Sequence, residues 1–297
     1  MNAHSPTDSR SDAETPGPTR PHAPVHRRRS LFTLVAALTT VLVTLLMASA
    51  GTGASASPVT RPNKPKPTIV LVHGAFADSS GWNAVAGQLL EDGYKVVAFS
   101  NPLRNPQSDG EYLRQFLTTI PGPVVLVGHS YGGAVITNGA TGNPNVKSLV
   151  YVAAYALDQG ESVSSANALG GGHTDVINHL ILRPYPGAPA GDADAYIDPA
   201  FFHQLFAQDL PRSTTALMAA TQRPGALGAL VTPSGPPAWK TIPSWFLVAK
   251  QDRIIPPEAE RAMAARARAK TVSINSSHVA MMSHPGVVVE LIKAAAR

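Results

Sequence analysis

The sequence lacks cysteine entirely: none occurs among its 297 residues. Such a chain has no disulfide framework and no thiolate that could serve as a nucleophile or a metal ligand. It also has no internal repeat, no phosphate-binding loop, no dinucleotide fingerprint and no cluster with metal-ligand spacing. These absences predict a protein that uses neither a cofactor nor a metal, and whose core alone supplies its stability.

Strong charge is missing as well. Charged residues make up only 14% of the chain, and the formal net charge is +5. Five arginines and three acidic residues fall within residues 1–56, so the remainder carries three of these five net charges. The basic residues are scattered, and "RAMAARARAK" has the pattern of one solvated helix face. We therefore expect no nucleic-acid partner.

The amino-terminal residues have the composition of a targeting segment. Residues 1–30 are rich in Pro, Ser, Thr and Arg and poor in apolar residues. Arg27 to Arg29 precede an apolar run that begins at Leu31, and small residues follow it. This order predicts an export signal over residues 1–56, loosely similar to a twin-arginine signal, and hence a secreted or extracytoplasmic protein. The alternative is that residues 31–50 remain uncleaved as a membrane anchor.

The rest of the chain suits one domain. Residues 57–67 read as a proline-rich linker, and residues 68–297 as an α/β domain. Short β-branched runs alternate with helically spaced segments, which predicts a doubly wound, mostly parallel sheet. The alternation fails over about residues 159–242, where glycines, prolines and short helical pieces occur. We interpret this stretch as an inserted helical cap over the carboxyl ends of the strands, where such folds bind ligands.

One serine stands between glycines where a strand passes into a helix. In "VVLVGHSYGGAVI", Gly128 and Gly132 flank Ser130 at a spacing of two residues on each side. A sharp strand-to-helix turn needs small flanking residues, and it presents the central hydroxyl at the edge of the sheet. The helix that follows favours developing negative charge at its first turn. Ser130 is therefore the candidate nucleophile.

A serine nucleophile needs a base, and the base needs an orienting acid. Asp252 follows the predicted strand "SWFLVAK", and His278 follows "KTVSIN". Both come at carboxyl ends of strands, and their order after Ser130 is the one that this kind of turn requires. Asp158 stays open as an alternative acid, because it follows another strand. The remaining histidines are interpreted as structural: His284 as a helix-start residue, His129 as pointing away from Ser130, and cap residues His173, His179 and His203 as packing.

Acyl transfer also needs donors for the oxyanion. The backbone N–H of Tyr131, directly after the nucleophile, is one candidate. The second should come from the loop after the first strand, where Ala75 is the first choice and Phe76 the next. We expect His73, which opens this loop, to hold it in place rather than to take part in catalysis.

These residues resemble the α/β-hydrolase superfamily over roughly residues 68–297, the cap excepted. The similarity is closest to the branch of bacterial carboxylesterases, plant methyl esterases and hydroxynitrile lyases, carried by "IVLVHGAFADSSGW", "VVLVGHSYGGAVI", "LVAKQDRIIPP" and "SSHVAMMSHP". It implies the α/β-hydrolase fold, a Ser130–Asp252–His278 triad, and oxyanion donors at Ala75 and Tyr131. Lyases of this branch carry threonine and lysine where this chain has Gly74 and Val279, which argues against a lyase.

We therefore expect an exported serine hydrolase that cleaves carboxylic esters of small to medium apolar substrates through an acyl-enzyme on Ser130. The alternatives are a non-hydrolytic enzyme of the same fold, of lyase or perhydrolase type, and a ligand-binding protein on the same scaffold. The expected partner is a small ester, with membrane contact only through an uncleaved amino-terminal segment. Bulky cap side chains could line the pocket or simply pack: Tyr185, Tyr196, Phe201, Phe202, Phe206, Met218 and Trp239.

Overall fold

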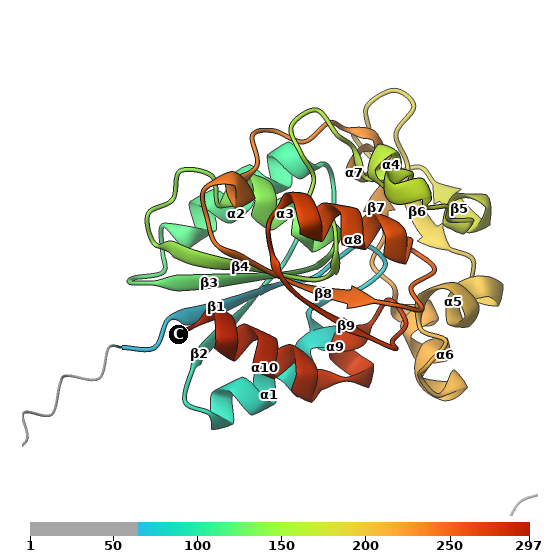
Figure 1. Cartoon of the computed structure of the whole chain (residues 1–297). Helices are drawn as coiled ribbons and strands as arrows, with labels where there is room; N and C mark the ends of the chain where they lie inside the picture. Colours follow the sequence, from blue (N-terminus) through green and yellow to red (C-terminus); the bar gives the residue numbers. More distant parts are fainter. Residues whose placement is uncertain (1–64) are drawn as a thin grey trace, which may run out of the picture. The chain divides into compact units, whose positions relative to one another are not determined.

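Six parallel strands form the central sheet in the computed structural model of the chain, which describes residues 65–297 (Figure 1). Every residue of β1, β3 and β8 is buried. Helices cover both faces of such a sheet, which explains these continuous apolar runs. The strands, in the order β2-β1-β3-β4-β8-β9, are β1 (Thr68–Val72), β2 (Lys95–Phe99), β3 (Val124–Ser130), β4 (Val146–Ala154), β8 (Ser244–Ala249) and β9 (Lys270–Ile274).

Helices lie on both faces of the sheet. Figure 1 shows α1, α9 and α10 on one face and α2, α3 and α8 on the other. Their bounds are α1 (Asn83–Glu91, preceded by the 3₁₀ turn η1, Ser79–Trp82), α2 (Pro106–Leu117), α3 (Tyr131–Gly139), α8 (Pro257–Arg266), α9 (Ala280–Ser283) and α10 (Pro285–Ala295). The doubly wound, mostly parallel sheet expected from the sequence is therefore confirmed.

The direction of winding reverses beside β1. The chain runs from β1 to β2 on one side, and then returns to place β3 on the other side of β1. In an open α/β sheet, ligands bind at such a switch point, outside the carboxyl ends of the strands. Ser130 ends β3, and Ala75 follows β1 by three residues. The topology thus brings these two candidate site residues to one crevice.

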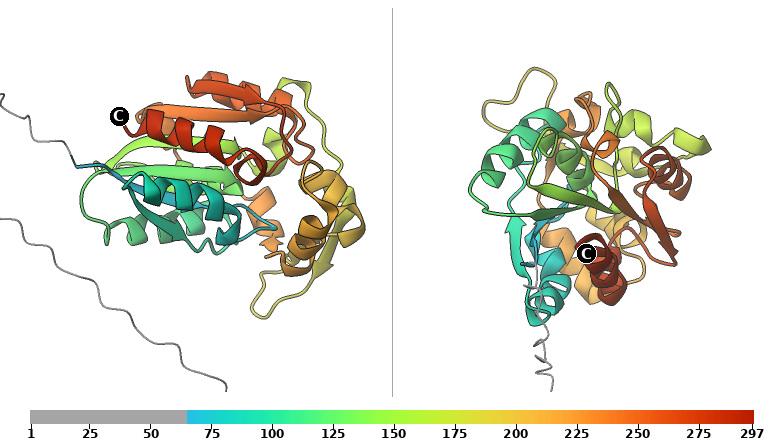
Figure 2. Two further views of the ribbon diagram at one scale, coloured as in Figure 1. Left: turned by 90° about the horizontal axis from the view of Figure 1, so that it is seen from below. Right: turned by 60° about the vertical axis from the view of Figure 1, so that its left-hand side comes forward.

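Most of the segment between β4 and β8, residues 155–243, lies at the end of the sheet toward which the strands point (Figure 2), and its last residues run back along α3 to the start of β8. It contains the expected helical pieces and also an antiparallel sheet, β5-β6-β7, that the sequence analysis did not predict. Its strands of four, four and two residues are too short to display a period of two. The elements are α4 (Val163–Ala166), η2 (Leu169–Gly171), η3 (Val176–His179), β5 (Leu180–Arg183), β6 (Asp194–Ile197), α5 (Pro199–Phe206), α6 (Arg212–Thr221), β7 (Gly225–Ala226), α7 (Leu227–Val231) and η4 (Ala238–Lys240).

The predicted export signal, residues 1–56, and most of the predicted linker, residues 57–67, lie outside the described residues. Between residues 65 and 297, none of the helices combines the length and the apolar character that crossing a bilayer requires.

Candidate active site

The turn at Ser130 is as sharp as the sequence indicates. Ser130 has φ 53° and ψ −127°, a conformation that L-residues rarely adopt, and only 4% of its surface is exposed. A Cβ atom on Gly128 would lie 2.6 Å from the carbonyl oxygen of Gly132, and one on Gly132 would lie 2.4 Å from that of Val72. Both flanking glycines are therefore required for β3, α3 and β1 to approach this closely.

The loop after β1 passes directly beside the candidate nucleophile. A Cβ atom on Gly74 would lie 2.6 Å from the Cβ atom of Ser130. His73 fixes this loop: its Nε2 accepts from the backbone N–H of Asn101 at 3.1 Å, so its Nδ1 carries the proton and donates to the Gly74 carbonyl at 3.0 Å. Burial lowers the pKa of His73, which favours this neutral form. These contacts fit the loop-holding role expected for His73.

The two candidate oxyanion donors line one cavity with Ser130. Ala75 and Tyr131 both border it. Tyr131 is the first residue of α3, where a backbone N–H has no partner within the helix. Its side chain points elsewhere, because its hydroxyl donates to Oδ2 of buried Asp109 on α2 at 2.6 Å. The backbone of Tyr131 thus remains beside Ser130 while its ring anchors α3 to α2.

Asp252 and His278 are in direct contact. His278 Nδ1 lies 2.6 Å from Asp252 Oδ2, and neither side chain has any exposed surface. The other carboxylate oxygen accepts from the backbone N–H groups of Ile254 and Ile255 at 2.7 and 2.9 Å. His278 Nε2 is buried without a hydrogen-bond partner among residues 65–297, Ser130 Oγ included. Catalytic hydrogen bonds often tighten only when substrate binds.

The rival residues have other contacts. Asp158 accepts from Lys240 Nζ at 2.6 Å, and His284 is the residue before α10. His129 packs against His278. Its Nε2 donates to the His278 carbonyl at 2.9 Å, and the centroids of the two rings are 4.6 Å apart. The three cap histidines contact Asp175, Phe201 and Thr215 respectively. Residues 65–297 contain no group of three or more potential metal ligands.

A cavity with about 430 Å³ of empty space, the Ser130 cavity, lies in front of the candidate nucleophile. None of the bulky cap residues considered above borders it. Phe202 and Phe206 belong to the core, and Tyr185 and Tyr196 lie under arginine side chains. The walls are mainly aliphatic. Periodicity could not reveal this lining, because most of its apolar residues come from loops and short elements. The lining residues are Ala75, Phe76, Ser130, Tyr131, Tyr155, Val163, Ser164, Asn167, Val176, Ile177, Leu180, Leu230 and Ile254.

Sequence reasoning missed one buried acid beside the Asp252–His278 pair. Glu260, on α8, has no exposed surface. Its Oε2 accepts from the backbone N–H of Ala249 at 2.9 Å, and its Oε1 has no partner within the described residues. Burial, together with the neighbouring carboxylate of Asp252, raises the pKa of Glu260 well above its usual value. In the sequence, its position one turn after the start of α8 was the only feature that distinguished Glu260, and this position does not reveal burial.

This raised pKa predicts how stability depends on pH. Above pH 4.5 the unfolded chain loses the Glu260 proton, whereas the folded protein keeps it until the raised pKa is reached. In that window, Glu260 lowers the free energy of unfolding by up to about 1.4 kcal/mol per pH unit as the pH rises. We expect Glu260→Gln to remove this contribution, so that the variant gains stability relative to the unsubstituted protein as the pH rises above 4.5.

Urea unfolding at each pH measures the effect. Glu258→Gln is the control, because Glu258 lies on the same helix but is half exposed and paired with Arg261 at 3.3 Å. It should leave the pH dependence unchanged. A constant difference in unfolding free energy between Glu260→Gln and the unsubstituted protein at all pH values would show that Glu260 is ionised in the folded state.

Comparisons with known proteins bear on the family and the fold of the chain. Residues 69–291 match the model of a family described as "Alpha/beta hydrolase family". The chain is 27% identical over 253 residues to alpha/beta hydrolase nvfD of Aspergillus novofumigatus, covering 78% of this chain and 97% of that protein. It is 31% identical over 144 residues to the carbendazim hydrolyzing esterase of a Nocardioides species, covering 40% of this chain and 60% of the other. The crystal structure of polyneuridine aldehyde esterase is similar with a TM-score of 0.68 and 20% identity, covering 78% of this chain and 100% of that one.

Proposed function

The chain belongs to the alpha/beta hydrolase family, and from this membership we propose that it is a serine esterase acting on small to medium apolar esters. Membership in this family and the fold that the sequence predicted are both confirmed. The finer assignment is supported by the residues around Ser130 and by esterases among the relatives.

The proposed reaction proceeds through an acyl-enzyme. Ser130 Oγ attacks the ester carbonyl carbon and transfers its proton to His278 Nε2. The oxyanion accepts hydrogen bonds from the backbone N–H groups of Ala75 and Tyr131. The carbon–oxygen bond to the alcohol breaks, and His278 returns the proton to the leaving oxygen. Water activated by His278 then releases the acid, while Asp252 orients the imidazole and stabilises its charged form.

The observation that carries the proposal is the state of His278. Its Nδ1 is held by a buried carboxylate at 2.6 Å, and its Nε2 is buried with no partner among residues 65–297. An unpartnered buried nitrogen costs stability, and a catalytic role is one reason for a protein to retain it. This nitrogen is the one that must accept and return the serine proton. A pure binding protein would have no use for such an arrangement, which disfavours that alternative.

The Ser130 cavity predicts the size of the acyl group. Its aliphatic walls suit an apolar acyl chain, and the space in it that admits the centre of a water-sized sphere is only about 30 Å³, which favours short and medium chains. We expect kcat/KM for p-nitrophenyl esters to be highest for short and medium acyl chains and to fall about tenfold or more for palmitate. The common leaving group keeps leaving-group chemistry constant through the series. A maximum at long chains would contradict this cavity assignment.

We further propose that the enzyme is exported. The support is the order of basic, apolar and small residues within residues 1–56. Mass spectrometry of the amino terminus of protein recovered outside the cytoplasm tests this directly. An intact amino terminus in the membrane fraction would favour the uncleaved anchor over residues 31–50.

A further inference from the structure

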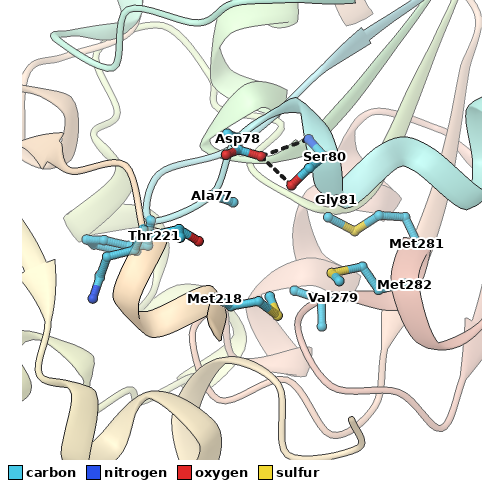
Figure 3. A pocket seen from close by; sticks show the side chains of 11 residues that line it. Ala77, Asp78, Ser80, Gly81, Met218, Thr221, Val279, Met281 and Met282 are labelled. Carbon is cyan, nitrogen blue, oxygen red and sulfur yellow. Dashed lines mark hydrogen bonds between the residues drawn. The ribbon is translucent and has the colours of Figure 1, made fainter. Parts of the chain in front are cut away.

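A second cavity, the Met218 cavity, lies beside the Ser130 cavity and contains about 370 Å³ of empty space. Its apolar lining includes three methionines, Met218, Met281 and Met282, together with Val279 (Figure 3). Across the space from them, Asp78 accepts hydrogen bonds from the backbone N–H and the hydroxyl of Ser80 at 2.8 and 2.5 Å. None of the roles described so far uses this cavity.

The Met218 cavity adjoins the catalytic groups at two points. Val279, in its wall, directly follows His278. Phe76 borders both cavities, so its ring is part of the wall between them. The backbone of Phe76 has φ 61°, and its ring contacts Phe206, which in turn contacts the His278 ring. Packing around the candidate base therefore fixes this wall.

The chemistry of acyl transfer assigns opposite sides to the two parts of an ester. The acyl carbon bonds to Ser130 Oγ while its oxygen faces Ala75 and Tyr131. All three of these residues border the Ser130 cavity. His278 is not among the described residues that line either cavity, but Val279, which directly follows it, lines the Met218 cavity. The alcohol oxygen must instead take its proton from His278 Nε2 as the carbon–oxygen bond breaks. The alcohol part consequently lies on the His278 side.

We propose that the Met218 cavity is the alcohol subsite: it binds the neutral, apolar alcohol part of the ester while the Ser130 cavity holds the acyl part. This assignment rests on the proposed esterase function. Methionine side chains are unbranched and flexible, so this lining can adapt to alcohol parts of different length. Because neither Ser130 nor His278 borders this cavity, it can contact only alcohol parts larger than methyl.

Two ester series test the assignment with the full chain. One series consists of acetates of methanol, ethanol, butanol and hexanol, and the other of methyl esters of acids of graded length. Met218→Phe fills the Met218 cavity, and Leu230→Phe fills the Ser130 cavity as the matched control. We expect Met218→Phe to lower kcat/KM for hexyl acetate about tenfold relative to methyl acetate, with the methyl-ester series changed by less than about twofold. Leu230→Phe should show the reverse pattern.

Thr221→Phe provides a second variant, because Thr221 borders the Met218 cavity but is exposed, and its hydroxyl bonds only to the Leu217 carbonyl of its own helix. It should therefore fold even if Met218→Phe does not. Two results would overturn the subsite assignment alone. One is that each Phe variant changes kcat/KM equally for the acetates and for the methyl esters. The other is that Met218→Phe and Thr221→Phe leave kcat/KM for the acetates unchanged. If the unsubstituted protein hydrolysed neither series, the esterase function itself would fail, and the assignment with it.

Discussion

Ser130→Ala is expected to lower kcat for ester hydrolysis by at least about 10⁴-fold. The substitution removes the attacking oxygen but leaves the backbone donors of Ala75 and Tyr131, the cavity and the Asp252–His278 pair in place. Some binding should therefore survive, and the loss should appear in kcat. Initial rates with p-nitrophenyl acetate measure the effect, and labelling by a fluorophosphonate provides a second readout that should disappear in the variant.

The structure supplies the control for this experiment. Ser164 also borders the Ser130 cavity with a hydroxyl group, but it does not stand at the strand-to-helix turn. Ser164→Ala should retain activity within about threefold and remain reactive with the fluorophosphonate. Stability should change little in Ser130→Ala, because alanine keeps the Cβ atom that this buried turn accommodates. Full turnover by Ser130→Ala would rule out the proposed nucleophile.

Asp252→Asn should have the next largest effect, about a 10⁴-fold loss of kcat. The side-chain oxygen of the asparagine would still accept from the backbone N–H groups of Ile254 and Ile255. Its NH₂ group would then face His278 Nδ1. An N–H group that donates to Nδ1 favours the imidazole tautomer with its proton on Nε2. In that tautomer Nε2 cannot accept the proton of Ser130. The buried pair would remain close, but with the wrong tautomer for a base.

Asp158→Asn is the matched control, because Asp158 also follows a strand of the sheet and was the alternative acid. Its carboxylate pairs with Lys240 Nζ at 2.6 Å, and about a third of its side-chain surface is exposed. Surface pairs of this kind contribute little, so activity should stay within about twofold. If Asp158→Asn were inactive and Asp252→Asn remained active, Asp158 and not Asp252 would be the orienting acid.

The candidate site residues could be predicted because each one ends or follows a strand of a regular sheet. Buried β-branched runs mark the strands, and parallel strands present their carboxyl ends at one edge. Ser130, Asp252 and His278 were therefore placed by local patterns alone. The contact between Asp252 and His278 followed from that placement, although they are 26 residues apart in the chain.

The linings of the two cavities could not be predicted in the same way, although Met218, one of the bulky cap residues considered from the sequence, does border the Met218 cavity. Val176, Ile177 and Leu180 come from a 3₁₀ turn and the start of a four-residue strand, which give no period to read. Large aromatic side chains were the main candidates for the cavity walls, but Phe202 and Phe206 pack in the core instead. The burial of Glu260 could not be predicted for a related reason. An acid near the start of a helix is ordinarily explained by its favourable interaction with the helix dipole, and only the fold reveals that this one is buried.

The support of His278 by His129 joins residues that are 149 positions apart in the chain. This separation determines when activity can arise during synthesis. Folding of the amino-terminal strands can form the turn around Ser130, but the candidate acid Asp252 and the candidate base His278 follow more than a hundred residues later. A nascent or truncated chain that ends before residue 278 contains Ser130 but lacks the candidate base His278. The proposed hydrolytic activity would therefore arise only after His278 has been synthesised.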